Sequence, residues 1–460
     1  MTMRYISTTK YNIIRGTLIM GLSTLCFFSL LSCGVSDSNK LFNGGNGSTE
    51  NPYQITTLEQ LQRIADVENL DKHFIQVADI DASASTELQN GSGFKFIGDA
   101  DQPFTASYDG NGYSIRNLKI NFNKFDQYNG MFGYVKEAVL ENITIDNRER
   151  LDNVDMSSYS SRKQKNQSQI EPADKQGVGG LVGMNDEGTI KNCHFYGKVI
   201  AFPGLVSAGF IGINKGSIEN SSFNGSKDGS GSGFVYENYG SIIGSSAHGD
   251  IQGQGISGFV RNNDGVIEFS YVNMRVTGYI GVAGFVSKNQ GEIRSSFMRG
   301  TIVGGRNSGG FVGDNYGQIE NVYILADLEM TIEDNGNFPP SYEIGGVVGR
   351  NDSGGVIQNA FIAGTMNIDG DVEFISSFGG YAAVNSGMID HGYWDQELTG
   401  MDVGVDEGDP EGATGLTTSE MTGPAAEQNM PEFDWVNIWR TTEDGYPVLR
   451  WEEELWVIYD

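Results

Sequence analysis

The stretch GGFVGDNYGQIENVYI, residues 309–324, is one of eight similar copies that follow one another along the chain. Each copy opens with a glycine that precedes a short apolar run. These glycines are Gly180, Gly209, Gly233, Gly258, Gly284, Gly310, Gly346 and Gly380. A degenerate ninth copy opens at Gly130 and has Val135 where the others have an asparagine. A repeat of about 25 residues predicts one stacked solenoid rather than several globular domains.

An asparagine stands five positions after each opening glycine, and most copies continue with x-Gly-x-Ile. Asn and Gly accept positive φ at low cost, so we predict that Asn-x-Gly turns the chain in every copy. Turn geometry and stacking of the amides explain the whole row, which we interpret as structural rather than glycan-binding. The asparagines are Asn185, Asn214, Asn238, Asn263, Asn289, Asn315, Asn351 and Asn385.

The residues after each turn alternate as in a β-strand. An isoleucine begins the strand and its neighbour is mostly polar, so the isoleucine is predicted to point inward. In the copy quoted above, this isoleucine is Ile319. Three places further on, every copy has a small residue, and five places on the residue is predominantly apolar. Such columns predict an all-β fold, a right-handed parallel β-helix of about nine coils with N- and C-terminal caps. The handedness is taken from β-helices in general.

A third column suggests a binding surface. The position four places after the isoleucine ends in five consecutive aromatic residues, Tyr271, Phe297, Tyr323, Phe361 and Tyr393. If the flanking columns face inward, these rings face outward and form a stripe suited to stacking on sugars or on a protein partner. The alternatives are that the phase is wrong, or that a loop or the C-terminal cap covers the stripe.

The recurring Gly-aromatic/aliphatic-Val-Gly run followed by Asn-x-Gly resembles the GLUG-motif repeat of bacterial surface proteins. That repeat occurs in adhesin-like and surface-anchored chains and beside the protease domains of some immunoglobulin A peptidases. The resemblance covers about 260 residues and departs from glycine at the fourth motif position in Tyr236, Arg261, Ser287 and Ala383. It implies the fold and a surface location, and it implies no particular activity.

The first residues read as a targeting segment. Arg4, Lys10 and Arg15 precede an apolar run that ends in Leu-Leu-Ser-Cys. This ending resembles a bacterial lipoprotein signal, which implies cleavage before Cys33 and acylation of its sulfur. An uncleaved anchor and a plain secretory signal are the alternatives. We expect an extracytoplasmic, lipid-anchored protein at the bacterial outer membrane or cell surface.

These patterns divide the chain into five parts. Capping boxes predict short helices that begin after Thr56 or Thr57 and after Thr417. The two longest repeat intervals predict excursions near residues 333–343 and 367–377. The parts are a signal peptide at 1–32, a polar tether at 33–50, an N-terminal cap with first strands at 51–126, β-helix repeats at 127–395 with a loop insertion at 147–177, and a C-terminal cap at 396–460.

The charge excludes some partners. The net charge of −29 becomes −32 when the three basic residues of the signal are removed, because that segment has no acidic residue. Nucleic acid is therefore not expected as a partner. We expect no cofactor and no defined metal site. The loop at 402–412 offers Asp402, Asp406 and Asp409 for loose calcium binding but lacks EF-hand spacing, so a solvated loop is preferred.

Signals for catalysis are weak. The four histidines form no H-E-x-x-H pattern, and Cys193 lies in the small inward column, where we expect a structural thiol. The segment Met388–His391, MIDH, resembles part of a pectate lyase, yet Ile389 belongs to the isoleucine column. We interpret that match as chance and assign no catalytic residue.

The sequence therefore favours a non-enzymatic, surface-anchored scaffold or adhesin that binds glycans or other surface polymers and reaches the membrane through its lipid anchor. Two alternatives stay open. One is a polysaccharide lyase or glycoside hydrolase built on a β-helix, and the other is a purely structural envelope protein. Oligomeric state is not addressed by these patterns.

Overall fold

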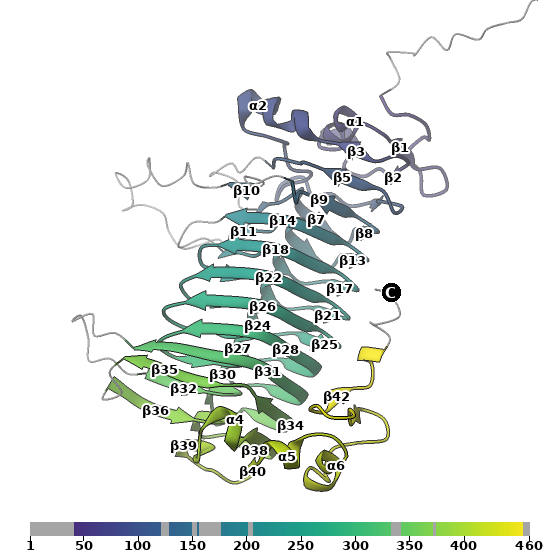
Figure 1. Ribbon diagram of the computed structural model, residues 1–460. Helices are drawn as coiled ribbons and strands as arrows, with labels where there is room; N and C mark the ends of the chain where they lie inside the picture. Colours follow the sequence, from purple (N-terminus) through teal and green to yellow (C-terminus); the bar gives the residue numbers. More distant parts are fainter. Residues whose placement is uncertain are drawn as a thin grey trace, which may run out of the picture. The chain divides into compact units, whose positions relative to one another are not determined.

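The computed structural model describes residues 41–120, 128–149, 154–155, 176–200, 206–332, 342–370 and 374–453. The chain divides into Met1–Lys40 and Leu41–Asp460, and all described residues belong to the second unit. That unit is a parallel β-helix, as predicted (Figure 1). Cys33 and its signal segment lie outside the described residues, as do most of 147–177 and 333–343.

One face of the β-helix is a ten-stranded sheet with one strand from each coil. Neighbouring strands run parallel and stay in register, so that equivalent residues lie side by side. The strands are β7 (Phe132–Lys136), β12 (Val182–Asp186), β16 (Ile211–Asn214), β20 (Val235–Asn238), β24 (Val260–Asn263), β27 (Val286–Asn289), β30 (Val312–Asn315), β33 (Val348–Asn351), β37 (Ala382–Asn385) and β39 (Val405–Gly408).

A second sheet of 22 strands continues each coil beyond the asparagine turn. In the early coils a short strand and a longer strand are separate, and from β28 onward they merge. The short strands are β8 (Val139–Glu141), β13 (Thr189–Lys191), β17 (Ser217–Glu219), β21 (Ser241–Ile243) and β25 (Val266–Glu268). The other strands on this side of the coil, most of them longer, are β9 (Thr144–Asp146), β10 (Val154–Asp155), β14 (His194–Ile200), β18 (Ser222–Asp228), β22 (Ser246–Gly253), β26 (Tyr271–Gly278), β28 (Glu292–Gly304), β31 (Gln318–Ile332), β34 (Val356–Ala363), β35 (Met366–Gly370), β38 (Met388–Asp395) and β40 (Ala413–Leu416).

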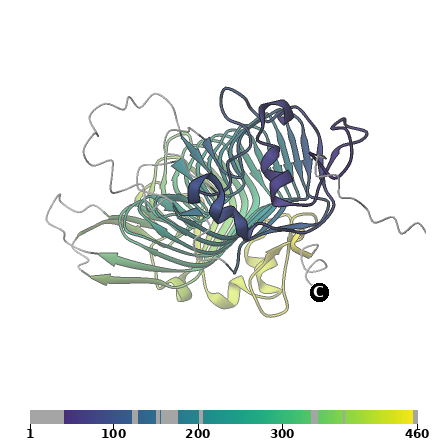
Figure 2. The ribbon, with the colours of Figure 1, turned by 90° about the horizontal axis from the view of Figure 1, so that it is seen from above.

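Smaller sheets close the third side of the coil. The two long repeat intervals become strands that project beyond the other coils, as Figure 2 shows at the green end of the sheet. No helix within the described ranges has the length and apolar character needed to cross a bilayer. The smaller sheets on the third side contain β6 (Tyr128–Asn129), β11 (Gly177–Val178) and β15 (Val206–Ser207); β19 (Gly231–Ser232) and β23 (Ile256–Ser257); and β29 (Ser308–Gly309), β32 (Tyr342–Gly345) and β36 (Ile375–Gly379).

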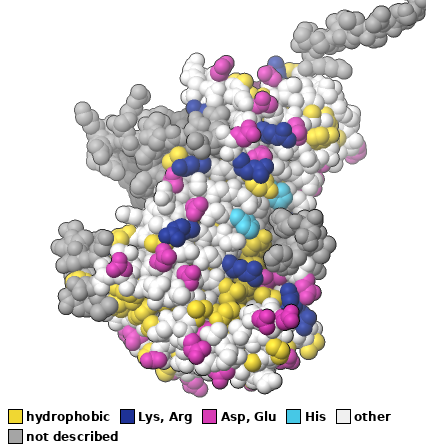
Figure 3. Space-filling model, in the orientation of Figure 1, with side chains coloured by type: hydrophobic (Ala, Val, Ile, Leu, Met, Phe, Trp, Pro, Cys, Tyr) yellow, Lys and Arg dark blue, Asp and Glu magenta, His cyan; other side chains and the backbone are white. Residues whose placement is uncertain are grey.

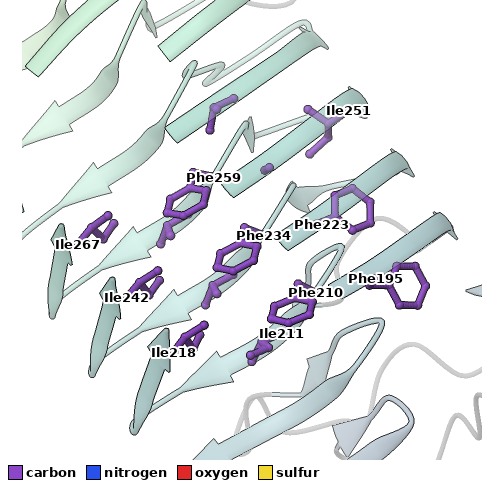
Figure 4. Packing of buried hydrophobic residues seen from close by; sticks show 14 of the residues in the cluster. Phe195, Phe210, Ile211, Ile218, Phe223, Phe234, Ile242, Ile251, Phe259 and Ile267 are labelled. Carbon is purple, nitrogen blue, oxygen red and sulfur yellow. The ribbon is translucent and has the colours of Figure 1, made fainter. Parts of the chain in front are cut away.

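The predicted inward columns fill the core. The isoleucine column is buried from Ile190 to Ile389, and its members pair directly from strand to strand. Phenylalanines of the repeat motif stack beside it, with ring centroids 4.9 Å apart between Phe210 and Phe234 and 4.7 Å apart between Phe234 and Phe259 (Figure 4). Each inward side chain therefore contacts its own counterpart above and below. This is why each column holds residues of similar size from coil to coil.

The eight asparagines form a continuous hydrogen-bonded ladder inside the turn. Each Nδ2 donates to the Oδ1 of the asparagine in the next coil at 2.7 to 2.9 Å. The ladder ends where Asn385 Nδ2 donates to the carbonyl of Asp409 at 2.7 Å. At the other end Asn185 Oδ1 is buried without a partner among the described residues, because Val135 stands opposite.

The predicted reason for these turns was wrong. Neither the ladder asparagines nor the following glycines, such as Gly240, have positive φ. Glycine is required there because the coils approach closely: a Cβ on Gly240 would lie 1.9 Å from the carbonyl oxygen of Gly216. Positive φ occurs instead at a second corner, two residues after each isoleucine, at Asn192, Asn220, Gly244, Phe269, Ser295, Asn321, Asn359 and His391.

The N-terminal region extends the stack rather than only covering it. Here β1 (Tyr53–Ile55), β2 (Phe74–Gln76) and β4 (Ser107–Asp109) pair in parallel and lead directly to β8. The predicted helix is α1 (Leu58–Arg63), and the Gln60 backbone N–H donates to Thr57 Oγ1 at 3.3 Å. The other elements are β3 (Ile80–Asp81), β5 (Ser114–Arg116), α2 (Leu88–Gly91) and two 3-10 turns, Val67–Asn69 and Ser83–Glu87.

The C-terminal region turns back along the flank of the β-helix. After α4 (Gln396–Thr399), it forms α5 (Thr418–Met421), α6 (Ala425–Asn429) and the antiparallel pair β41 (Trp439–Arg440) and β42 (Val448–Leu449). The predicted capping box is present at Thr417 and Glu420. Figure 1 shows this yellow segment beside the last coils. We call residues 421–453 the C-terminal strap.

Candidate ligand-binding surfaces

The predicted aromatic stripe exists and lies outside the coil. Tyr271, Phe297, Tyr323 and Phe361 pair in register on β26, β28, β31 and β34, and Tyr393 follows on β38. Their rings stack, with centroids 4.9 Å apart between Phe297 and Tyr323 and 5.5 Å apart between Tyr323 and Phe361. They belong to a hydrophobic cluster separate from the interior core, so the predicted outward phase agrees with the structure.

The stripe is nevertheless not a free surface, which corrects the predicted binding site. Tyr323 and Phe361 are 0% exposed, and Phe297 and Tyr393 are 3% and 6% exposed. Trp439 of the C-terminal strap packs over the aromatic stripe, with its ring 5.8 Å from that of Phe361. A row of rings this long is costly to leave in water, and the strap supplies the apolar cover. Only Tyr271, at the edge, is partly exposed.

Buried polar contacts hold the strap in place. Tyr323 Oη donates to Glu452 at 3.0 Å, Arg299 pairs with the same carboxylate at 2.9 Å, and the Leu449 backbone N–H donates to it at 2.8 Å. Burial raises the pKa of Glu452 and opposes the effect of Arg299, and burial also raises the pKa of Tyr323. The strap is therefore attached by defined hydrogen bonds as well as by apolar packing.

Charged groups on the face formed by the 22-stranded sheet do not form a patch of one sign. Figure 3 shows basic and acidic side chains interspersed on this face, with apolar side chains gathered toward the last coils. Several of the charged groups neutralise each other in pairs, such as Lys198 with Asp228 at 2.6 Å and Arg275 with Glu329 at 3.1 Å. This face therefore offers no strong electrostatic attraction for a polyanion.

A wide groove lies at the end of the stack. We call it the end groove; its volume is about 590 Å³, and its lining includes Asp390, His391, Asp409, Glu411 and Thr414. His391 Nδ1 lies 3.3 Å from Asp390 Oδ1, and Gln358 Nε2 donates to the other carboxylate oxygen at 3.1 Å. All four residues of the MIDH segment thus line this groove. The sequence interpretation treated that segment as a chance match.

A narrower groove follows the asparagine corner. We call it the corner groove; its volume is about 190 Å³, and its lining is Glu237, Tyr239, Asn262, Asn263, Asp264, Lys288 and Gln290. Buried Asn263 forms its floor as a member of the asparagine ladder. Six of the eight residues that directly follow the ladder asparagines are exposed. They include two tyrosines, Tyr239 at 40% and Tyr316 at 41%.

The corner groove was missed by the sequence interpretation. Its signal is the position directly after the ladder asparagine, which has tyrosine in the two copies that read Asn-Tyr-Gly, at Tyr239 and Tyr316. The position before the asparagine supplies the opposite wall, and Glu237, Asn262 and Lys288 pair in register there. Reading these two columns together would have predicted a polar groove with aromatic side chains.

The other candidates from the sequence, Cys193 and the acidic loop, make contacts within the protein. Cys193 is fully buried, and burial raises the pKa of its thiol to about 12, so the thiol stays protonated. In the acidic loop, Asp406 accepts from the Phe378 backbone N–H and Asp409 from the Glu411 backbone N–H, both at 3.0 Å. Within the described part of the chain, no group of three or more His, Cys, Asp or Glu side chains is placed to hold a metal ion.

One polar residue interrupts an apolar column. Lys227 of β18 is 0% exposed and pairs in register with Val199 and Ile251. Its Nζ donates to the Gly229 carbonyl at 2.7 Å and also to that of Ser230. Burial lowers the pKa of Lys227 to about 7, against a weaker opposing effect of Asp228. The amine therefore folds into the core with two carbonyl acceptors and no carboxylate contact.

Comparisons with known proteins give partial matches. No family model matches the chain. It is 43% identical over 110 residues to Halomucin of Haloquadratum walsbyi, a match that covers 22% of this chain and 1% of that protein. It is 36% identical over 115 residues to a provisionally named Gly-rich membrane protein of Evansella cellulosilytica, covering 25% of this chain and 13% of that one.

A solved structure covers more of the chain at lower similarity. It is the crystal structure of a provisionally assigned immunoglobulin A1 protease from Bacteroides ovatus, with 17% sequence identity and a TM-score of 0.40. The superposition covers 89% of this chain and 96% of that one. The curated relatives share only a small fraction of their own length with this chain.

Proposed function

We propose that this protein is a non-enzymatic scaffold that binds surface polymers, glycans foremost, along the flank of its β-helix. The observation that carries the proposal is the corner groove, where an exposed side chain follows the ladder asparagine in five successive coils, from Lys215 to Tyr316. A polymer presents equivalent groups at regular intervals, and a stack of coils presents exposed side chains at regular intervals. The covered aromatic stripe has no part in this proposal.

Attachment to a bacterial surface completes the proposal. The Leu-Leu-Ser-Cys ending at Cys33 and the resemblance to GLUG-motif repeats support a lipid-anchored protein outside the cytoplasm. One partial relative is named a membrane protein, which agrees with this location. The predicted tether at 33–50 is too long, because Phe42 is buried and stacks on Tyr53 in the first coil. Only the segment from Cys33 to Lys40 would then separate the anchor from the β-helix.

The end groove favours one alternative, a polysaccharide lyase or hydrolase. Asp390, Asp409 and Glu411 place carboxylates around an open space, and His391 is an acid or base candidate beside Asp390. Hydrolysis of a glycosidic bond uses two carboxylates that flank the substrate. The same surroundings fit a binding groove without turnover, so the product of the reaction must be measured.

Co-sedimentation tests both possibilities at once. The purified full-length chain, held in mild detergent, is mixed with insoluble polysaccharides, with and without Ca²⁺, and released sugar is assayed in the supernatant. Retention without released sugar is the expected result. Release of oligosaccharide that disappears in Asp390→Asn would establish the enzyme alternative, and absence of retention on every polysaccharide would refute the binding proposal.

A further inference from the structure

We propose that the corner groove binds the pyranose rings of a neutral, extended polysaccharide, with Tyr239 and Tyr316 as two stacking platforms. The inference rests on the proposed function and specifies its site and ligand class. Three properties of the corner support it: two exposed rings, a lining that mixes hydrogen-bond donors with acceptors, and a repeat spacing suited to an extended chain.

Tyr239 is exposed but held in position. Its Oη donates to Glu237 Oε2 at 2.9 Å, and Glu237 is itself only 6% exposed. The ring therefore has little conformational freedom to lose when a ligand stacks on it, which favours binding. The apolar faces of a pyranose suit an aromatic ring fixed in this way.

Polar groups surround that ring at the positions where sugar hydroxyls would lie. Asn262 and Gln290 offer both donors and acceptors, Asp264 offers acceptors, and Lys288 offers donors. Gln290 Nε2 also donates to Asp264, which orients the two side chains toward each other across neighbouring coils. A hydroxyl both donates and accepts, so this mixed lining fits a polyol better than it fits an ion of one sign.

A second platform lies three coils further along the same corner. Tyr316 occupies the position of Tyr239, after Asp264 and Gln290 in the intervening coils, and its backbone N–H donates to the Asn289 carbonyl at 2.8 Å. Three coils at the usual strand spacing separate the platforms by about 14 Å. Lys288 Nζ lies 5.0 Å from the Tyr316 ring centroid and links that ring to the groove. An extended oligosaccharide, but not a disaccharide, can reach both rings.

Charge selects a neutral chain. The protein has a net charge of −29, and the corner groove contains Glu237 and Asp264 beside a single lysine. Polyuronates and sulfated glycans would be repelled at low ionic strength. Binding of a neutral glycan depends on stacking and hydrogen bonds, so it should change little with salt.

Calorimetric titration of the full-length chain with cello-, xylo- and manno-oligosaccharides of two to six units tests the site. We expect Tyr239→Ala to weaken binding of the preferred series by about tenfold or more, since truncating a central aromatic contact has this effect. Tyr316→Ala should weaken the hexasaccharide but leave the disaccharide unchanged. Tyr239→Phe should bind more tightly than Tyr239→Ala but more weakly than the wild type, because the ring remains while its hydrogen bond to Glu237 is lost.

The matched control is Tyr113→Ala. Tyr113 is 36% exposed, similar to Tyr239, and lies outside the corner groove. The site assignment is refuted if the wild-type chain binds a neutral oligosaccharide and Tyr239→Ala binds it equally well, which would leave the proposed function standing. If the wild type binds only polygalacturonate, the ligand class is wrong, and if it binds no polysaccharide, the site and the proposed function fail together.

Discussion

At the scale of single residues, the asparagine ladder joins coil to coil through one amide per repeat. Each amide from Asn214 onward both donates to the next coil and accepts from the previous one, so the bonds all run in the same direction along the stack. Buried chains of hydrogen bonds of this kind are costly to interrupt, because the remaining partners lie where water does not reach.

We therefore expect Asn263→Ala to destabilise the protein by about 2–4 kcal/mol, because it removes the donor to Asn289 Oδ1 and leaves Asn238 Nδ2 with only the Gly240 carbonyl at 3.3 Å. Denaturant unfolding followed by circular dichroism measures the change. Asn273→Ala is the control, since Asn273 is exposed on β26. Equal stability of the two variants would show that the ladder contributes little.

Lys227 makes stability depend on pH. Its pKa is about 7 in the folded protein and 10.5 in the unfolded chain, so the unfolded chain binds more protons between these values. The free energy of unfolding should therefore rise from pH 7 to pH 9.5 and stay flat below pH 7, as far as this group determines it.

Lys227→Met should remove this rise and stabilise the protein at pH 7 by up to about 5 kcal/mol. Comparing how the free energy of unfolding changes with pH in the two proteins separates the effect of the lysine from that of the tyrosines, whose raised pKa values act at higher pH. Parallel slopes for wild type and variant would contradict the buried, depressed amine.

At the scale of elements, the C-terminal strap is a structure of its own laid on the β-helix. Its side chains share a hydrophobic cluster with the aromatic stripe and not with the interior core. It should therefore detach without unfolding the coils beneath it.

Trp439→Ala should release the strap. The change removes a fully buried ring and the hydrogen bond from Trp439 Nε1 to Asn321 at 3.1 Å, and such truncations cost about 3–5 kcal/mol. Hydrogen exchange should become faster in residues 421–453, while the strands beneath the strap, β28, β31, β34 and β38, keep their protection. Val436→Ala, at a site 79% exposed, should change neither region, and a simultaneous loss of protection throughout would show that strap and coils form one unit.

The inward columns could be predicted from sequence because each position repeats its own environment in every coil. Ile319 has an isoleucine above and below it, and this local rule decides its burial. The cover over Tyr323 could not be predicted in this way, since it comes from residues such as Glu452, 129 positions away. A repeat pattern shows which side chains point outward, but it contains no information about what a distant segment places over them.

Other errors of the sequence interpretation have a similar cause. We predicted positive φ at the ladder asparagines because Asn and Gly occur in positive-φ turns, but they also occur where coils approach closely. Only the backbone dihedral angles show that the two corners differ. Lys227 stands in a column of Val and Ile, and the two carbonyls that accept its hydrogen bonds come from Gly229 and Ser230, in a turn that the columns do not describe.

At the scale of the whole molecule, the proposal requires a β-helix held outside the cytoplasm by lipid on Cys33. Cys33→Ser should abolish incorporation of labelled fatty acid and move the protein from the membrane fraction to the soluble fraction of a producing bacterium. Asn273→Ala again serves as the control and should remain labelled. Labelling that persists in Cys33→Ser would place the lipid elsewhere, and a chain never labelled would refute the anchor.

The strap also has a mechanical consequence. A tethered protein that holds a polymer transmits tension, and tension along the stack would peel coils apart one row of bonds after another. The strap touches the rings of Phe297, Tyr323, Phe361 and Tyr393, which belong to four successive coils. It therefore joins these coils in shear, so that they should yield together at a higher force than unstrapped coils, as single-molecule pulling would measure.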